Sequence, residues 1–214
     1  MQIGTVAALW RYPVKSLAAE PLAAVEIEAD GLAGDRRRAL LVGNAKHARY
    51  GKPFRGKEHH LLHTLTTEQA ACDVGAAAGV VLAPIGGERY FDAEPVSLLW
   101  DSWLADVEAL VGRPLDPLRF RPNIFIRATP PFERRERELV GVTLTVGESV
   151  LRVSATIGRC VTTTYDVATG DRDPNVLRAG ALQRANTVGV YCTITQPGAV
   201  ALGDAVSESG PAFW

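Results

Sequence analysis

After Pro117 the chain is almost entirely a series of short apolar runs separated by turn residues, and this pattern constrains the fold more than any other feature. The runs are "NIFIRA" (123–128), "VTLTVGESVLRVSA" (142–155), "TVGVYCTITQ" (187–196) and "AVALGDAV" (199–206). Gly147 and Glu148 have the position of a hairpin turn, and one helix is expected near "PNVLRAGALQRA" (174–185). Short, closely spaced strands of this kind are typical of a barrel. The sequence therefore predicts a mainly β protein of the α+β class, with a β-barrel and a few short helices.

The first half of the chain contains a second set of strand-like runs. These runs are residues 3–12, 23–31 and 36–43. Their apolar residues alternate with a period of two, which indicates the short strands of a smaller barrel. The stretches from Tyr12 to Ser16 and from Asp30 to Arg36 have the residues that turns require. A polar, His-rich stretch over residues 44–63 is long enough to favour a functional or mobile loop.

Two helices are expected in the middle of the chain. Thr66 and Gln69 have the spacing of a capping box, which predicts a short helix that ends at Gly79 and is followed by a strand in "GVVLAPI". A second helix is expected where apolar residues recur at helical spacing before Gly112 and Pro114. The residues in this pattern are Val96, Leu99, Trp103, Val107 and Leu110.

Composition excludes several classes of function. The net charge of −1 over 214 residues argues against a general cationic surface for nucleic acid or anionic membranes. The sequence has no run of about 20 apolar residues and no secretory leader pattern, so we expect a cytoplasmic protein with no nucleic-acid or membrane partner. Three cysteines without a CxxC pair argue against disulfides and a Cys-rich zinc site. Neither a GxxxxGK[ST] loop nor a strand-linked GxGxxG occurs, which disfavours nucleotide-binding α/β folds.

Cys160 is the candidate reactive residue. It follows Gly158 and Arg159 at the end of a predicted strand and precedes "VTTTYDVATG". A neighbouring guanidinium and exposed backbone N–H groups stabilise a thiolate. The alternative is a buried packing cysteine, which is the interpretation we give to Cys72 and Cys192.

Three pairs of residues at turns or strand ends could bind an anion. They are Arg121 and Asn123 in "RPN", Lys15 and Ser16 after "YPV", and Asp35 and Arg36 after a Gly-rich turn. Guanidinium groups bind phosphate with two parallel hydrogen bonds, and amides suit a heterocycle. Each pair taken alone is also compatible with a solvated surface charge.

Taken together, these segments resemble the MOSC family with its N-terminal barrel domain, a family that includes the mitochondrial amidoxime-reducing component. The segments are "YPVKS", "GLAGDR", "RFRPNIFI", "GRCVTTTYDVATG" and a final "VGVYC…GAVALGD", in that order along almost the whole chain. The resemblance implies an N-terminal β-barrel-like domain over residues 1–94 and a MOSC β-barrel domain over residues 95–209.

The resemblance also implies a site for the molybdenum cofactor (Mo-molybdopterin). Cys160 would be the thiolate ligand of the metal and the catalytic residue. The residues that would hold the pyranopterin and its phosphate are Lys15, Ser16, Arg36, Arg121, Asn123 and Arg159. A soft thiolate suits a metal already held by dithiolene sulfurs, and hard donors suit the phosphate.

The function that this resemblance implies is a molybdenum-dependent oxidoreductase that reduces N-hydroxylated small molecules. The sequence lacks a ferredoxin-type cysteine cluster and a CxxCH haem motif, so electrons would come from a separate donor protein. Two alternatives remain open. Cys160 could carry a persulfide in sulfur transfer, or the chain could bind the cofactor without catalysis.

A rival metal site is suggested by "KEHHLLH". His59 and His63 at spacing i, i+4 would share a face if the segment were a helix. The segment lacks the HExxH pattern and an evident third ligand, so polar loop histidines are the simpler interpretation.

Overall fold

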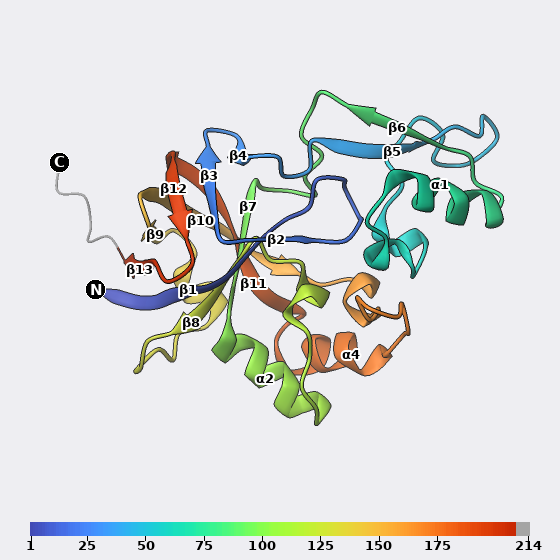
Figure 1. Cartoon of the computed structure of the whole chain (residues 1–214). Helices are drawn as coiled ribbons and strands as arrows, with labels where there is room; N and C mark the ends of the chain where they lie inside the picture. The colour runs from blue at the N-terminus through green and yellow to red at the C-terminus, as the bar shows by residue number, and fades with distance from the viewer. Residues whose placement is uncertain (209–214) are drawn as a thin grey trace.

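A closed ring of seven β-strands forms the centre of the molecule in a computed structural model that describes residues 1–208 (Figure 1). The order around the ring is β13–β9–β10–β11–β7–β8–β1, and β13 pairs with β1 to close it. The strands are β1 (Gln2–Arg11), β7 (Val96–Trp100), β8 (Ile124–Ala128), β9 (Thr143–Val146), β10 (Ser149–Gly158), β11 (Thr187–Gln196) and β13 (Ala205–Glu208). Neighbouring strands are antiparallel except for β7 and β8, which are parallel. The predicted mainly β fold with a barrel is confirmed.

Alternating side chains fill the barrel. Leu144 and Val146 of β9, and Leu151 and Val153 of β10, are buried, and the residues between them are more exposed. Burying one such side chain contributes about 1.5–3 kcal/mol, so each strand adds several such increments to one shared core. This period of two is the sequence signal that predicted these strands.

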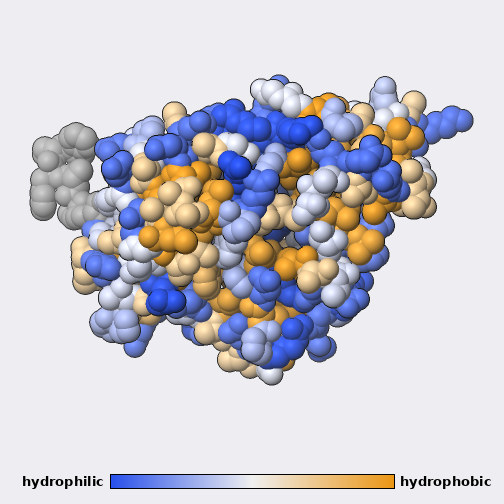
Figure 2. Space-filling view, in the orientation of Figure 1, coloured by the Kyte–Doolittle hydropathy of each residue, from blue (hydrophilic) through white to orange (hydrophobic). Residues whose placement is uncertain are grey.

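Two smaller sheets flank the barrel. β3 (Ala24–Glu28) pairs with β4 (Gly31–Leu32) and with β12 (Gly198–Ala201), and β5 (Arg38–Val42) pairs with β6 (Leu82–Gly86). β2 (Glu20–Leu22) extends from β1. Around β3 and β12, apolar side chains gather on the surface shown in Figure 2, and Leu202 there is 49% exposed.

The segment after β5 forms a second hydrophobic core apart from the barrel. It contains the 3-10 helices η1 (Gly56–Glu58) and η2 (Leu62–Thr64) and the helix α1 (Glu68–Ala77), which lies beside β5 and β6 in Figure 1. Its core residues include Val14, Leu17, Leu40, Phe54 and Leu62. The stretch expected to be a functional or mobile loop therefore contributes buried residues to this core.

Strands from both halves of the chain share sheets. β1 lies in the barrel, and β12 pairs with β3 of the first half. A domain boundary between residues 94 and 95 stays a prediction.

The expected helix over Val96–Leu110 is wrong in its first part. Val96–Trp100 is the strand β7, and the helix α2 spans Asp101–Val111 before Gly112 at φ +80°. All five residues of β7 are buried, because it is a central strand of the barrel wall. A strand buried on both faces has a continuous apolar pattern that periodicity cannot separate from a helix.

The other helices lie close to their predicted places. The N-cap of α1 is Thr67 and not Thr66, since the Thr67 hydroxyl accepts a hydrogen bond from Ala70 N. The predicted helix near residues 174–185 is α4 (Pro174–Gln183), and it contacts α2. The remaining helices are η3 (Pro117–Phe120), α3 (Glu136–Leu139) and η4 (Val161–Thr164). Within residues 1–208 no helix has both the length and the apolar character needed to cross a membrane.

Gly4 allows the close approach of β1 and β8 in the barrel, so we expect Gly4→Ala to destabilise the protein by about 1–3 kcal/mol. A Cβ at this position would lie 2.4 Å from Ile126 Cγ2 and 2.9 Å from the Arg127 carbonyl oxygen. Urea unfolding measures the change. Gly180→Ala in α4 is the matched control, because a Cβ there meets open space and should stabilise the helix by up to about 1 kcal/mol. Equal effects of the two substitutions would contradict this account of the barrel.

Candidate functional site

Four of the predicted site residues line one hollow beside the end of β10. They are Arg36, Arg121, Arg159 and Cys160. The hollow has about 510 Å³ of space between protein atoms, part of it open to solvent. Its other lining residues are Asp92, Ser97, Arg119, Phe120, Ile157, Gly158, Thr162, Thr163 and Tyr191.

Cys160 is exposed at this hollow, at the point where β10 ends and η4 begins. Its Sγ lies 3.2 Å from the Thr162 hydroxyl oxygen. The Thr163 hydroxyl donates to the Cys160 carbonyl oxygen at 3.0 Å, and the Thr164 hydroxyl donates to Val161 O at 2.6 Å. The three threonines thus fold the turn around the cysteine and leave its thiol accessible.

Asp166 ties this turn to the "RFRPN" segment. Its carboxylate accepts hydrogen bonds from the backbone N–H groups of Ala168 and Thr169 and from Arg119 Nη2 at 2.6 Å. Arg119 is buried and also donates to Thr164 O at 3.1 Å. These hydrogen bonds, the largest effect coming from Ala168 N–H, lower the pKa of Asp166. Arg119 therefore joins the "DVATG" turn to the end of η4, four residues after Cys160.

Arg36 and Arg121 meet on the ring of Tyr12. Their guanidinium carbons lie 4.7 Å and 4.1 Å from the ring centre, which is the geometry of cation–π contacts. Tyr12 is buried, its hydroxyl donates to Pro122 O at 3.0 Å, and burial raises its pKa to about 12. Arg36 also pairs with the fully buried carboxylate of Asp35, which accepts a hydrogen bond from Tyr12 N. The ring and the carboxylate hold two like charges side by side.

Arg159 lines the hollow, but its guanidinium is directed to backbone carbonyl groups and not to the thiol. Its guanidinium donates to Phe120 O and to Val188 O, both at 2.7 Å, and no hydrogen bond to Cys160 Sγ is present within residues 1–208. Burial lowers the pKa of Arg159, and likewise that of Arg121, to about 10, so both side chains stay protonated at neutral pH. One amino group of Arg121, Nη2, is shielded from solvent and has no hydrogen-bond partner among residues 1–208. A shielded, unpartnered cationic donor of this kind fits an anionic ligand.

The structure places Lys15, Ser16 and Asn123 next to the hollow, with their polar atoms used inside the protein. Lys15 Nζ donates to Tyr90 O and Phe91 O and pairs with Asp92, which lines the hollow. Ser16 Oγ donates to Phe54 O. Asn123 accepts from Ser97 Oγ at 2.9 Å and donates to Trp10 O at 3.3 Å. These contacts brace the strand ends and turns that carry the arginines.

The histidines of "KEHHLLH" do not form the metal site considered above. His59 caps η1 and His63 lies in η2, so they do not share a helix face, and no group of three or more potential ligands occurs within residues 1–208. His63 is not a polar loop residue either, because it is only 4% exposed and contacts Arg121. No pattern in the sequence indicates this burial. Cys192 is fully buried in the barrel core, which confirms it as a packing residue, and Cys72 packs against the second core.

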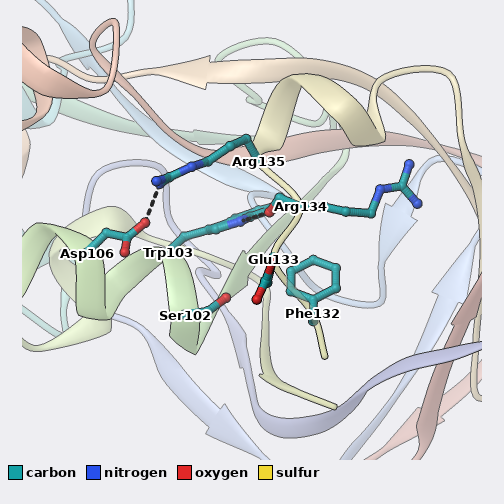
Figure 3. A pocket seen from close by; sticks show the side chains of 7 residues that line it. All are labelled: Ser102, Trp103, Asp106, Phe132, Glu133, Arg134 and Arg135. Carbon is teal, nitrogen blue, oxygen red and sulfur yellow. Dashed lines mark hydrogen bonds and ion pairs between the residues drawn. The ribbon is translucent and has the colours of Figure 1, made fainter. Parts of the chain in front are cut away.

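A second hollow lies between α2 and the segment before α3 (Figure 3). Arg135 points to Asp106 across it, and Trp103 Nε1 donates to Arg134 O at 2.7 Å. None of the predicted site residues lines this hollow, and it contains no thiol. The hollow at Cys160 is therefore the candidate functional site.

Comparisons with known proteins agree with this fold. Residues 86–207 match the MOSC domain, and no curated protein matches the chain. The YuaD protein from Bacillus subtilis superposes with a TM-score of 0.58 at 15% identity, over 95% of this chain and 94% of that one. A crystal structure of a hypothetical protein gives a TM-score of 0.52 at 12% identity, over 98% of this chain and 70% of the other. At these identities the two structures show a shared fold alone.

We expect Asp166→Asn to lower stability at pH 7 by about 1–2 kcal/mol, because it removes the charge that Arg119 and two N–H groups bind. A carboxyl group whose pKa is lowered by folding contributes stability above its unfolded pKa, and this contribution is lost as the pH falls through the folded value. The variant should therefore lose less stability than the natural protein between pH 5 and pH 2.5, as measured by urea unfolding. Glu133→Gln, at an exposed position, is the control and should leave the natural pH dependence in place. An unchanged pH dependence in Asp166→Asn would contradict the role of this turn.

Proposed function

The chain belongs to the MOSC domain family, and on this premise we propose that it binds a molybdenum cofactor in the hollow at Cys160 and reduces N-hydroxylated small molecules. The observation that carries the proposal is an exposed thiol on the same hollow as four arginines, one of which has an N–H donor without a partner among residues 1–208. This combination offers a soft ligand and hard anion-binding donors in one site.

Different residues of this chain would bind different parts of the cofactor. Cys160 would supply the thiolate that binds the metal, and Arg36, Arg121 and Arg159 would face the pterin and its phosphate. Lys15, Ser16 and Asn123 would act by holding the turns in place. When bound, a molybdenum cofactor supplies a redox-active metal that can accept oxygen from an N-hydroxylated substrate.

The overall reaction needs two electrons and two protons, because the hydroxyl oxygen leaves as water and the N–O bond becomes an N–H bond. We propose a separate donor protein in the cytoplasm as the source of the electrons. The small-molecule substrate would enter by the open side of the hollow, where Thr162 and Tyr191 lie near the thiol. Neither nucleic acid nor a membrane is part of the proposal.

The metal content of the protein tests whether Cys160 is the ligand of molybdenum. We expect about one molybdenum per chain in protein made by a host that builds the cofactor, and loss of most of it in Cys160→Ser, because a serine hydroxyl stays protonated at neutral pH and cannot replace the thiolate. Elemental analysis by mass spectrometry measures it. Cys72→Ser is the matched control and should keep its metal, since Cys72 lies in the second core. Full metal content in Cys160→Ser would refute the assignment.

Retention of the cofactor tests whether the arginines of the hollow bind its phosphate. Charge-assisted hydrogen bonds contribute roughly 1.5–3 kcal/mol, so Arg121→Ala should release the cofactor about 10- to 100-fold more readily during dialysis. Arg137→Ala removes an exposed arginine outside the hollow and should have no effect. Equal loss from both variants would indicate a diffuse electrostatic field in place of a defined site.

Activity assays separate the oxidoreductase from a sulfur carrier. With reduced viologen as electron donor, we expect metal-loaded protein to convert an amidoxime to its amidine and metal-free protein to be inert. A persulfide carrier needs only the nucleophilic thiol and would transfer sulfur without metal. Sulfur transfer from Cys160 at equal rates in both samples, with N-reduction in neither, would favour the carrier. Bound cofactor with neither activity would favour a non-catalytic binding protein.

A further inference from the structure

We propose that His63 is a positioning residue for Arg121: it binds one amino group of the guanidinium and leaves the other free for a phosphate-type anion in the hollow. This inference deepens the proposed function and rests on it for the identity of the anion. The observations behind it are contacts of His63 with other residues of this chain.

His63 has one ring nitrogen between two partners. Its Nδ1 lies 3.0 Å from Arg121 Nη1 and 2.9 Å from Ser16 O. Its other nitrogen, Nε2, is buried and has no partner among the described residues. The guanidinium also contacts the Tyr12 ring, whose centre lies 4.1 Å from Arg121 Cζ. Arg121 therefore has contacts at its ring-facing carbon and at Nη1, while Nη2 has no partner among residues 1–208, and the residue lines the hollow.

These contacts specify the tautomer of His63. A guanidinium can only donate, so Nδ1 must accept if the contact with Arg121 is a hydrogen bond, and the proton must then be on Nε2. The contact with Ser16 O requires the opposite tautomer, in which Nδ1 carries the proton. Burial and the nearby Arg121 charge lower the pKa of His63 to about 3, so the ring is neutral at pH 7 and one nitrogen cannot serve both partners. Our proposal requires that Arg121 takes Nδ1.

The polar segment 44–63 determines the position of the His63 imidazole. The imidazole packs directly on Gly56, where a Cβ would lie 2.3 Å from His63 Cε1. Leu62, next to His63, and Phe54 are buried in the second core. The segment thus presents one buried side chain to the site, and this is a role that its polar sequence does not reveal.

Nitrogen-15 NMR of histidine-labelled protein at pH 7 tests the tautomer. We expect His63 to show protonated Nε2 and unprotonated Nδ1, with the signal assigned by its loss in His63→Asn. In Arg121→Ala the proton should move to Nδ1, because Ser16 O is then the remaining partner. Protonated Nδ1 in the natural protein would overturn the proposal, and this measurement does not depend on the folding of any Arg121 variant.

Binding of inorganic phosphate, measured by calorimetry on cofactor-free protein, tests the positioning. His63→Leu should bind phosphate about tenfold more weakly, because the guanidinium loses its fixed orientation. His63→Asn keeps an acceptor near the place of Nδ1 and should restore most of the affinity, which a purely structural role would not explain. Equal affinities of the natural protein and His63→Leu, or no phosphate binding by the natural protein, would overturn the proposal. The metal content of Cys160→Ser tests the proposed function independently of these results.

Discussion

The buried carboxylate of Asp35 is the interaction on which the arginine cluster depends. It accepts a hydrogen bond from Tyr12 N at 2.6 Å and pairs with Arg36, so it joins the turn after β1 to the Gly-rich turn after β4. Tyr12 in turn reaches Pro122 through its hydroxyl. Three segments that are far apart in the sequence are therefore joined around one charge. Without this carboxylate, the like charges of Arg36 and Arg121 would lie on the same ring with little compensation.

The same turns contain unusual backbone conformations. Ser16, Arg36 and Arg121 all have positive φ values, of 73°, 47° and 52°, although none of them is glycine. Such conformations cost of order 1–3 kcal/mol each and persist where the surroundings fix them. Here the surroundings are the Tyr12 ring, the Asp35 carboxylate and the barrel strands. These backbone conformations lower the stability of the fold but set the directions of the three side chains. This supports a binding role for the turns.

Much of the fold could be predicted from the sequence, because strands that are buried on one face alternate with a period of two. β7 could not, since its continuous apolar pattern is also that of a buried helix. In the site, Arg36, Arg121 and Cys160 were identified from turn and strand-end motifs, and the structure brings them to one hollow. The sequence does not identify His63 as part of the site. It packs on Gly56, at a spacing that fits no regular period, and its polar partners Ser16 and Arg121 lie far away in the sequence.

The different exposure of the thiol and the guanidiniums has a physical reason. An anion gains most from cationic donors that are shielded from water, because screening is weak there and the donors are already oriented. A thiolate that binds a metal must instead stay accessible, since the metal needs an open position for its substrate. In this chain Arg159 donates to Phe120 O and Val188 O, and Cys160, the next residue, is exposed. Both residues follow β10, which ends at Gly158, and both line the hollow, so this short segment would offer the proposed cofactor a shielded cationic group and an accessible thiol.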